Sequence, residues 1–398
     1  MKLGIALERR EGERRVAATP ETVKQLTGLG LEVLVESGAG LESGHPDEAY
    51  QDAGAWIVDT LEPGNLDILA HVRPLDPDTA RSLKQGAVTV GLASPSSELS
   101  TVRALAETGV TSFSLELVPR ISRAQSMDAL TSQALVAGYR CVLEAATRLP
   151  RFFPLYMTAA GTIPPARVLV LGAGVAGLQA IGTAKRLGAR VSANDIRPAS
   201  ADEVASMGGT FIRLDVETAE ASGGYARELS ADRGALQREL LAPHVAAADV
   251  LITTAAVPGR RAPLLVTLAM VQAMRPGSVV VDLAAESGGN VEGVVAGEDT
   301  VIPTADGRGM VTLVGMKDAA SALPADASRL YAKNVASLLE LLVRDGAFAP
   351  DWEDEVVAGS CLTHDGAVRH GPTAEALAAL APEGAGFAAD GSAKEGTN

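Results

Sequence analysis

A glycine-rich segment, Gly172-Ala-Gly174-Val-Ala-Gly177, has the most specific chemistry in this sequence. It directly follows the apolar run 168–171 and opens a helical stretch over 178–187. In such a strand–turn–helix unit the first glycine permits a tight turn and the second lets the backbone approach a pyrophosphate. The third allows close helix–strand packing, and the helix N-terminus offers unpaired N–H groups. The segment therefore predicts a dinucleotide site.

An acid at the end of the next strand, predicted over 190–195, extends this interpretation. Asp195 lies 18 residues beyond Gly177, where a carboxylate accepts hydrogen bonds from the adenosine ribose and repels a 2′-phosphate. Arg197 could instead attract that phosphate. The spacing favours NAD and leaves NADP open.

Polar residues also end the later strands, predicted over 249–254 and 278–283. Thr253, Thr254 and Glu286 are candidates there, because parallel sheets bind ligands at the carboxyl ends of their strands. Ordinary capping of the strand ends is an equal alternative.

The segment PRISRAQSMD, residues 119–128, combines Arg120, Arg123, Gln125 and Asp128 at the start of a long helical stretch over 127–149. If that helix runs between two domains, its start opens into a nucleotide cleft. The alternative is a solvated helix cap, with Ser126 or Asp128 accepting from free N–H groups.

Other catalytic patterns are missing from the sequence. There is no GxSxG, HExxH, P-loop or CxxC. Cys361 with His364 and His370 makes a poor metal site, and we expect surface histidines and no metal there.

The elements that position these residues alternate between short strands and helices. Apolar runs over 3–7, 31–35, 55–58, 68–72, 87–92 and 111–115 predict strands, and Thr19-Pro20-Glu21 starts a helix over 20–29. A second α/β unit begins at Arg167, and helical stretches over 127–149 and 326–342 carry the chain between the units. The predicted fold is therefore α/β, with two Rossmann-like domains built on parallel sheets and linked by long helices.

The domain boundaries follow from this order of elements. We expect a discontinuous first domain of residues 1–124 and 325–372, and a nucleotide-binding domain of residues 125–324. Residues 373–398 are rich in Ala and Gly and should be loosely ordered.

Composition narrows the class of protein further. The 398 residues include 34 Lys and Arg against 49 Asp and Glu, a formal charge of −15, which argues against nucleic acid. The chain shows no apolar run of the ~18 residues that a membrane helix needs, and no apolar segment of a secretory signal near its start. Its two cysteines fit a reducing compartment.

Four segments together resemble a known family: PRISRAQSMD, TAAGTIPPARVLVLGAGVAGLQAIGTAKRLGA, DLAAESGGN and EGERRVAATPETV. They are similar, in the expected order over residues 1–345, to the NAD(H)-binding α component of proton-translocating NAD(P) transhydrogenase, or to its soluble first part. Alanine dehydrogenases, which share the two-domain fold, are that family's closest relatives.

The resemblance assigns roles to individual residues. It implies that Arg120, Gln125 and Asp128 surround the nicotinamide and its ribose and carry the catalytic role. Thr131 stands where the family usually has Ser. Further NAD contacts implied by the resemblance or by the fingerprint are Gly172, Gly174, Val175, Ala176, Gly177, Asp195, Arg197, Thr254 and Glu286, with Gly224 and Tyr225 in a mobile loop, 223–226, that closes over the nucleotide.

Physical chemistry separates the two relatives. Oxidation of alanine needs an acid–base group, whereas hydride transfer between two nicotinamides needs only their orientation. At positions where alanine dehydrogenases resemble one another in having a Lys and a His, this chain has His71 and Gly91, and Glu286 replaces an Asp. Two departures from the transhydrogenases are the missing Lys near His71 and Lys317-Asp318-Ala-Ala320 in place of Asn-x-Pro.

The resemblance therefore implies a transhydrogenase component that passes hydride from NADH to NADP⁺ on a partner subunit. It implies a homodimer, an NADP(H)-binding subunit and a membrane-embedded subunit that translocates protons, with the chain itself in the cytoplasm at the inner membrane. One alternative is an NAD-dependent alanine or amino-acid dehydrogenase, in which Arg15 binds a carboxylate and His71 acts as the acid–base group. The other is a non-catalytic NAD-binding protein.

Overall fold

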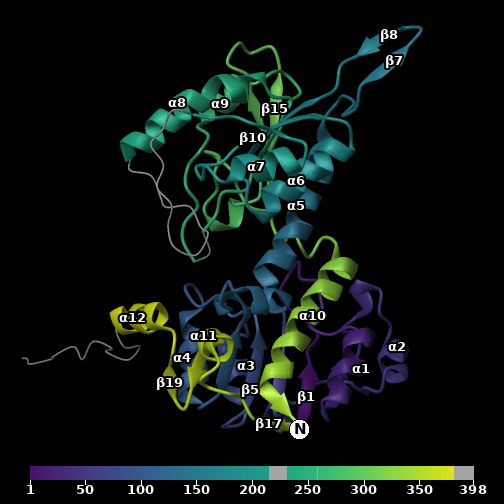
Figure 1. Ribbon diagram of the computed structural model, residues 1–398, viewed down its shortest axis with the longest axis vertical. Coiled ribbons are helices and arrows are strands. Elements are labelled where there is room, and N and C mark those ends of the chain that lie inside the picture. Colours follow the sequence, from purple (N-terminus) through teal and green to yellow (C-terminus); the bar gives the residue numbers. More distant parts are fainter. Residues whose placement is uncertain (215–230, 258, 381–398) are drawn as a thin grey trace, which may run out of the picture.

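The computed structural model describes residues 1–214, 231–257 and 259–380, and it contains two large sheets joined by two long helices (Figure 1). The predicted α/β class is confirmed. None of the helices in these ranges is long and apolar enough to cross a bilayer.

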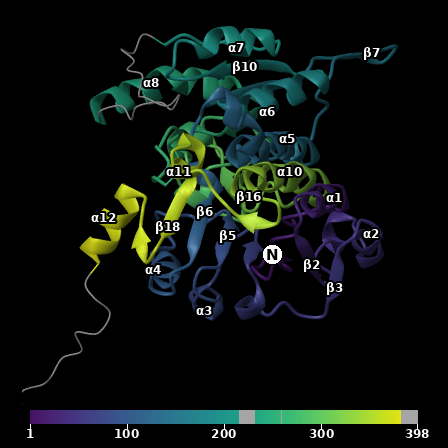
Figure 2. The same ribbon diagram turned by 60° about the horizontal axis from the view of Figure 1, so that its bottom comes forward.

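The first sheet has eight strands in the order β19-β18-β6-β5-β4-β1-β2-β3. β1 to β6 are parallel, while β18 runs antiparallel to β6 at one edge (Figure 2). The strands are β1 (Lys2–Ile5), β2 (Glu32–Glu36), β3 (Trp56–Val58), β4 (Ile68–Ala70), β5 (Val88–Gly91), β6 (Thr111–Ser114), β18 (Cys361–His364) and β19 (Ala367–Val368).

Helices flank this sheet, and their starts follow local capping rules. Thr19 caps the first helix with Pro20 directly after it, as the sequence predicts. The helices are α1 (Pro20–Gly28), α2 (Asp47–Asp52), α3 (Pro77–Ser82), α4 (Leu99–Glu107), α11 (Glu355–Ser360) and α12 (Gly371–Ala379).

The second sheet has the order β11-β10-β9-β12-β13-β15-β14, in which only β14 is antiparallel to its neighbour. Its central strands are buried along their length, which explains their continuous Val, Leu and Ile runs. The strands are β9 (Arg167–Leu171), β10 (Arg190–Asn194), β11 (Thr210–Phe211), β12 (Val250–Thr253), β13 (Val279–Asp282), β14 (Asp299–Pro303) and β15 (Met310–Gly315). The helices are α6 (Val175–Arg186), α7 (Ser200–Ser206), α8 (Ala231–Ala247) and α9 (Leu268–Gln272).

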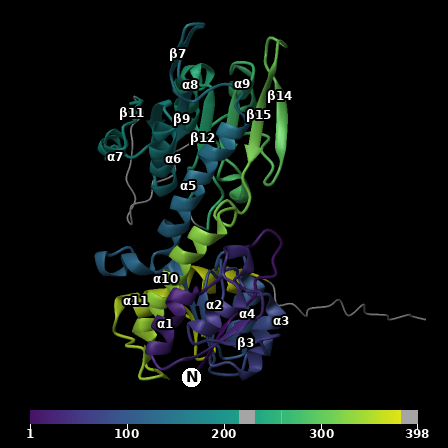
Figure 3. The ribbon, with the colours of Figure 1, turned by 90° about the vertical axis from the view of Figure 1, so that its right-hand side faces the viewer.

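Two long helices, α5 (Ala129–Arg148) and α10 (Pro324–Leu342), run between the sheets (Figure 3). They lie side by side, because Gln133 Nε2 donates to the Ala327 carbonyl at 3.1 Å and Ser132 Oγ donates to Asn334 Oδ1 at 2.7 Å. After α5 the chain forms a hairpin, β7 (Tyr156–Thr158) and β8 (Gly161–Ile163), that projects from the second sheet. A smaller hairpin, β16 (Val343–Arg344) and β17 (Ala347–Phe348), follows α10.

The C-terminal region corrects two expectations. Residues 371–379 form α12, because Pro372 suits the first helical turn and buried Thr373 bonds to His370 and to the Pro95 carbonyl. The loose order expected from residue 373 is therefore wrong for 373–379, and 381–398 lie outside the described residues. His364 and His370 are half-buried rather than on the surface, and His364 lies against Trp352.

Candidate dinucleotide site

The three fingerprint glycines have the separate roles that the motif predicts. Gly172 has a φ of +96°, and a Cβ atom there would lie 2.8 Å from Thr254 Oγ1. A Cβ atom on Gly177 would lie 1.9 Å from the Gly172 carbonyl oxygen, so this position requires glycine for packing. Gly174 is exposed, and a Cβ atom there would meet no described atom within 4 Å. The open side of Gly174 leaves room for a ligand group against the backbone.

The helix after these glycines has an N-terminus suited to an anion. Gly174 is the N-cap of α6, and no side chain among the described residues caps the helix. The first intrahelical bond runs from the Leu178 N–H to the Gly174 carbonyl at 2.8 Å. The backbone N–H groups of Val175 and Ala176 open the helix beside Gly174. Residues and geometry therefore fit a pyrophosphate.

Asp195 follows β10 and braces the glycine loop directly. Its Oδ2 accepts from the Ala173 N–H at 2.7 Å, and its Oδ1 accepts from the Arg197 N–H at 2.8 Å. The Arg197 guanidinium folds back onto the same carboxylate, with Nε 3.1 Å from Oδ1, and also donates to the Ala173 carbonyl at 3.1 Å. Asp195 therefore holds the loop while lying at the end of the strand where a ribose would bind.

A pocket of about 130 Å³ adjoins Asp195. Phe211 and Leu214 supply apolar surface, and Arg213 and Gln237 supply polar groups, a combination typical of a site for a flat heterocycle. Sequence reasoning missed these residues. Their signal was weak, because β11 has only two residues and the chain continues irregularly after it.

The strand-end candidates divide into a structural residue, a buried residue and an acid. Thr254 Oγ1 donates to the Gly172 carbonyl at 3.0 Å and so closes the fingerprint turn. Thr253 is fully buried in β12. Glu286 accepts from the Asp318 N–H at 3.1 Å, and burial raises the pKa of its carboxyl against the opposing charges of Arg73 and Lys317.

The DLAAESGGN segment positions the loops around this edge of the sheet, through two residues that carry no mark in the sequence. Buried Asp282 accepts from the N–H groups of Ala284, Asn290 and Val291 at 2.7 to 3.0 Å. The Asn290 side chain bonds to both the N–H and the carbonyl of Ala255, at 3.0 and 2.7 Å. The motif thus fixes the loop that follows β12.

The PRISRAQSMD segment forms a short 3₁₀ helix, Ser122–Met127, that leads into α5. Asp128 caps α5 by accepting from the Thr131 N–H at 2.8 Å and from Thr131 Oγ1 at 2.6 Å, so the predicted cap is confirmed for Asp128. Arg123 forms two 2.8 Å contacts with Asp354. Arg120 and Gln125 are exposed, which leaves both available at the start of the interdomain helix.

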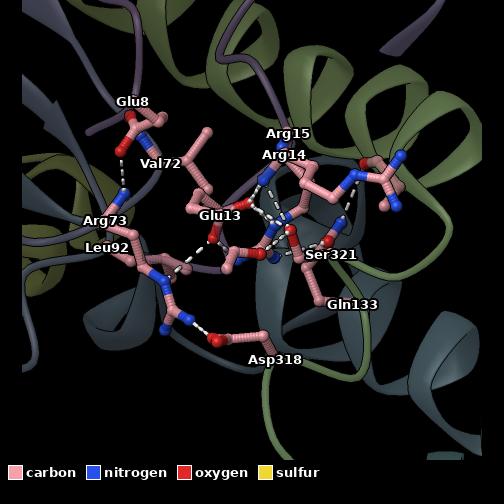
Figure 4. A network of polar contacts seen from close by, with 12 residues as sticks. Glu8, Glu13, Arg14, Arg15, Val72, Arg73, Leu92, Gln133, Asp318 and Ser321 are labelled. Atoms are coloured by element: carbon pink, nitrogen blue, oxygen red, sulfur yellow. Dashed lines mark hydrogen bonds and ion pairs between the residues drawn. The ribbon is translucent and has the colours of Figure 1, made fainter. Parts of the chain in front are cut away.

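A cluster of charged residues, Glu13, Arg15, Arg73 and Asp318, connects the first sheet to the end of the second (Figure 4). Arg15 donates twice to Glu13, at 2.7 and 2.6 Å, and once to Gln133 Oε1 at 2.8 Å. Burial alone would raise the pKa of Glu13, but the hydrogen bonds and charge of Arg15 outweigh it and hold the pKa at about 2. Sequence reasoning missed this cluster, whose members lie far apart in the chain.

His71 is buried beside Arg73. Its Nδ1 lies 2.7 Å from the Arg73 carbonyl oxygen, and burial lowers the pKa of its ring to about 4. A Cβ atom on Gly91 would lie 2.5 Å from His71 Nδ1, so the ring fills the space that a side chain at position 91 would need.

One segment of the expected site lies outside the described residues. This is the loop 223–226, with Gly224 and Tyr225, which we expect to close over the nucleotide. Within the described ranges the structure places the fingerprint glycines, Asp195, Arg197 and Thr254 together, and it places Arg120, Gln125, Asp128 and Thr131 together at the start of α5.

Comparison with known proteins places this site in a family. Two family models match the chain: "Alanine dehydrogenase/PNT, N-terminal domain" over residues 4–137 and "Alanine dehydrogenase/PNT, C-terminal domain" over residues 141–371. The first of the separate chains that make up the NAD(P) transhydrogenase alpha subunit of Rhodospirillum rubrum is 46% identical over 382 residues, covering 93% of this chain and 98% of that protein. The solved transhydrogenase structure from Sinorhizobium meliloti superposes with a TM-score of 0.80 at 43% identity, covering 94% of this chain and 100% of that one. Alanine dehydrogenase of Bacillus subtilis is 32% identical over 304 residues, 74% of this chain and 73% of that protein. The chain belongs to the alanine dehydrogenase/PNT family, within its NAD(P) transhydrogenase alpha-subunit branch.

Proposed function

We propose that this chain is the NAD(H)-binding component of a proton-translocating NAD(P) transhydrogenase, which passes hydride from NADH to NADP⁺ held by a partner subunit. The observation that carries the proposal is the fit of the fingerprint to a dinucleotide. Gly174 leaves open space at the uncapped start of α6, and the chain matches almost the whole length of a relative named as a transhydrogenase subunit.

The bound nucleotide in this proposal is NAD rather than NADP. The Asp195 carboxylate lies at the ribose end of the site and would repel a 2′-phosphate. Arg197, the residue that could attract such a phosphate, contacts Asp195 instead. NADP then binds to the partner subunit.

The nicotinamide end of the site consists of Arg120, Gln125, Asp128 and Thr131. The nicotinamide supplies the hydride, so these residues need only orient the ring and its ribose. Asp128 and Thr131 hold one another at the start of α5, which gives this end a fixed frame. The exposed Arg120 and Gln125 side chains complete it.

An alanine dehydrogenase is the second candidate, favoured by the 32% identical relative from Bacillus subtilis. In that function Arg15 would bind a carboxylate and His71 would move a proton. Arg15 instead makes all its described contacts with Glu13 and Gln133, and the low pKa of buried His71 keeps the ring neutral near pH 7. Both features favour the transhydrogenase.

The partners follow from the same proposal. The projecting β7–β8 hairpin exposes Tyr156, Met157 and Ile163, and we assign it to a homodimer contact. A membrane-embedded subunit couples hydride transfer to proton translocation. The chain then works in the cytoplasm, held at the inner membrane by its partner subunits.

A paired assay on the purified chain tests the proposed function. NADH binding is followed by nucleotide fluorescence, and NAD⁺ reduction is followed with alanine as donor. Binding without alanine-dependent reduction is the expected result. Turnover with alanine would move the assignment to the second candidate, and lack of NADH binding would remove both.

A further inference from the structure

The charged cluster contains two guanidinium groups and two carboxylates, and it joins segments from both sheets. Glu13 and Arg15 lie between β1 and α1, and Arg73 follows β4. Asp318 follows β15 of the second sheet and pairs with Arg73. The cluster is therefore closed by one carboxylate that comes from the nucleotide-binding side.

The position of Asp318 places the cluster at the nicotinamide half of the site. Strand order reverses between β9 and β12, and Asp195 occupies the side of β10. In doubly wound sheets the second half of a dinucleotide extends the other way, over the carboxyl ends of strands such as β12, β13 and β15. Asp318 comes three residues after β15 ends at Gly315.

The local backbone holds Asp318 in place for this contact. Asp318 has a φ of +49°, in the left-handed region that Asp and Asn tolerate better than most residues. Its N–H donates to Glu286, and Gly12 packs so closely that a Cβ atom there would lie 2.5 Å from Asp318 Oδ2. Ser321 then ties the same loop to the Arg14 N–H at 2.6 Å.

Charge and burial show what the carboxylate does for its neighbours. The Asp318 side chain is 9% exposed and the Arg73 side chain 25% exposed, while Glu13 is fully buried. Two negative and two positive charges cancel within the cluster. Arg15 is already engaged by Glu13 and Gln133, so Arg73 is the guanidinium that a small anionic substrate would meet.

We propose that Asp318 is a specificity-determining residue, whose carboxylate occupies the Arg73 position that a small 2-oxo acid would need beside the nicotinamide. The inference rests on the proposed function and deepens it. With this anion position filled from within the chain, bound NADH has no small carboxylate acceptor and retains its hydride for the partner's nucleotide.

The test uses oxamate, an unreactive isostere of a 2-oxo acid, added to the complex of the full chain with NADH. Asp318→Asn removes the charge and suits the left-handed backbone, and Asp318→Gly serves as a second variant for the same backbone reason. Asp299→Asn is the matched control, because Asp299 is a carboxylate of the same sheet that pairs with Arg148. NADH affinity is measured first for every protein.

We expect oxamate to change NADH fluorescence in both Asp318 variants, with an affinity at least about tenfold above that of the wild type and of Asp299→Asn. Adding Arg73→Gln to Asp318→Asn should abolish the gain. Equal oxamate affinity in wild type and both variants would overturn the inference, as would a gain that survives Arg73→Gln. Failure of the wild type to bind NADH would instead refute the proposed function.

Discussion

Gly138 of α5 lies directly against Ala176 in the first turn of α6: a Cβ atom on Gly138 would be 2.1 Å from the Ala176 carbonyl oxygen. The helix that links the two sheets therefore touches the backbone of the helix that begins the dinucleotide site. This contact fixes the start of α6 relative to the start of α5, where Gln125 and Asp128 lie.

Gly138→Ala should destabilise the protein, because the new methyl group overlaps backbone atoms that cannot rotate away. Overpacking of this kind costs about 1–3 kcal/mol. Gly28→Ala is the control, since Gly28 ends α1 and its Cβ would meet no described atom within 4 Å. Urea denaturation measures both variants, and a Gly138→Ala protein as stable as Gly28→Ala would contradict the contact.

Gly174→Ala should separate binding from folding. A Cβ atom there has open space on the protein side and a backbone φ of −75°, so stability should barely change. The methyl group would occupy the space proposed for the pyrophosphate, and NADH affinity should fall at least about tenfold, the equivalent of about 1.4 kcal/mol. Gly177→Ala should instead lose stability, because its Cβ meets the Gly172 carbonyl. Titration and thermal melts distinguish the two, and unchanged NADH affinity in Gly174→Ala would remove the pyrophosphate from this position.

Gln125→Asn should leave NADH binding nearly intact and slow hydride transfer in the reconstituted complex. Gln125 is exposed at the start of the interdomain helix, where a shorter amide would misplace the ring without removing a catalytic proton. The control is Gln85→Asn, an exposed glutamine of the other domain. Equal losses in NADH affinity and in transfer rate would argue against an orienting role.

Glu13 should make stability depend on acid pH. Its pKa is about 2 in the folded protein against 4.5 as the ordinary value, so its contribution of about 3 kcal/mol is present above pH 4.5. The contribution is lost as the pH falls from 4.5 towards 2. Glu13→Gln leaves Arg15 and Arg73 without this partner and should cost about 3–5 kcal/mol near neutral pH.

The slope of stability against pH checks this assignment. Between pH 4.5 and 2 the free energy of unfolding should fall less steeply in Glu13→Gln than in the wild type. Glu42→Gln, which removes an exposed carboxylate beside Arg14, should keep the wild-type slope. A Glu13→Gln protein with the wild-type slope would show that other carboxylates dominate acid unfolding.

Local patterns predict the fingerprint and its elements well. The strand, turn and helix around Gly172 to Gly177 depend on contiguous residues, so periodicity and glycine positions suffice. Capping predicts the start of α1 at Pro20 and the role of Asp128 for the same reason. The antiparallel edges β14 and β18 were not predicted, because strand direction depends on partners distant in the chain.

The charged cluster could not be predicted from spacing. Glu13, Arg73 and Asp318 meet only after both sheets have formed and α5 and α10 have packed together, and nothing local marks them as partners. The adenosine-side pocket fails for a related reason, since Phe211 and Gln237 come from separate elements. The polar neighbours of His364 and His370 predict a surface position, whereas Trp352 and Thr373 cover them from distant or later segments.

Hydride transfer to a partner is the most direct test of the central claim. The chain is loaded with NADH and mixed in a stopped-flow instrument with an NADP⁺-loaded nucleotide-binding subunit from a related transhydrogenase, and loss of NADH absorbance is recorded. We predict transfer that needs both proteins and is unaffected by alanine or pyruvate. Stable NADH in the presence of the loaded partner, together with NAD⁺ reduction by alanine, would contradict the account.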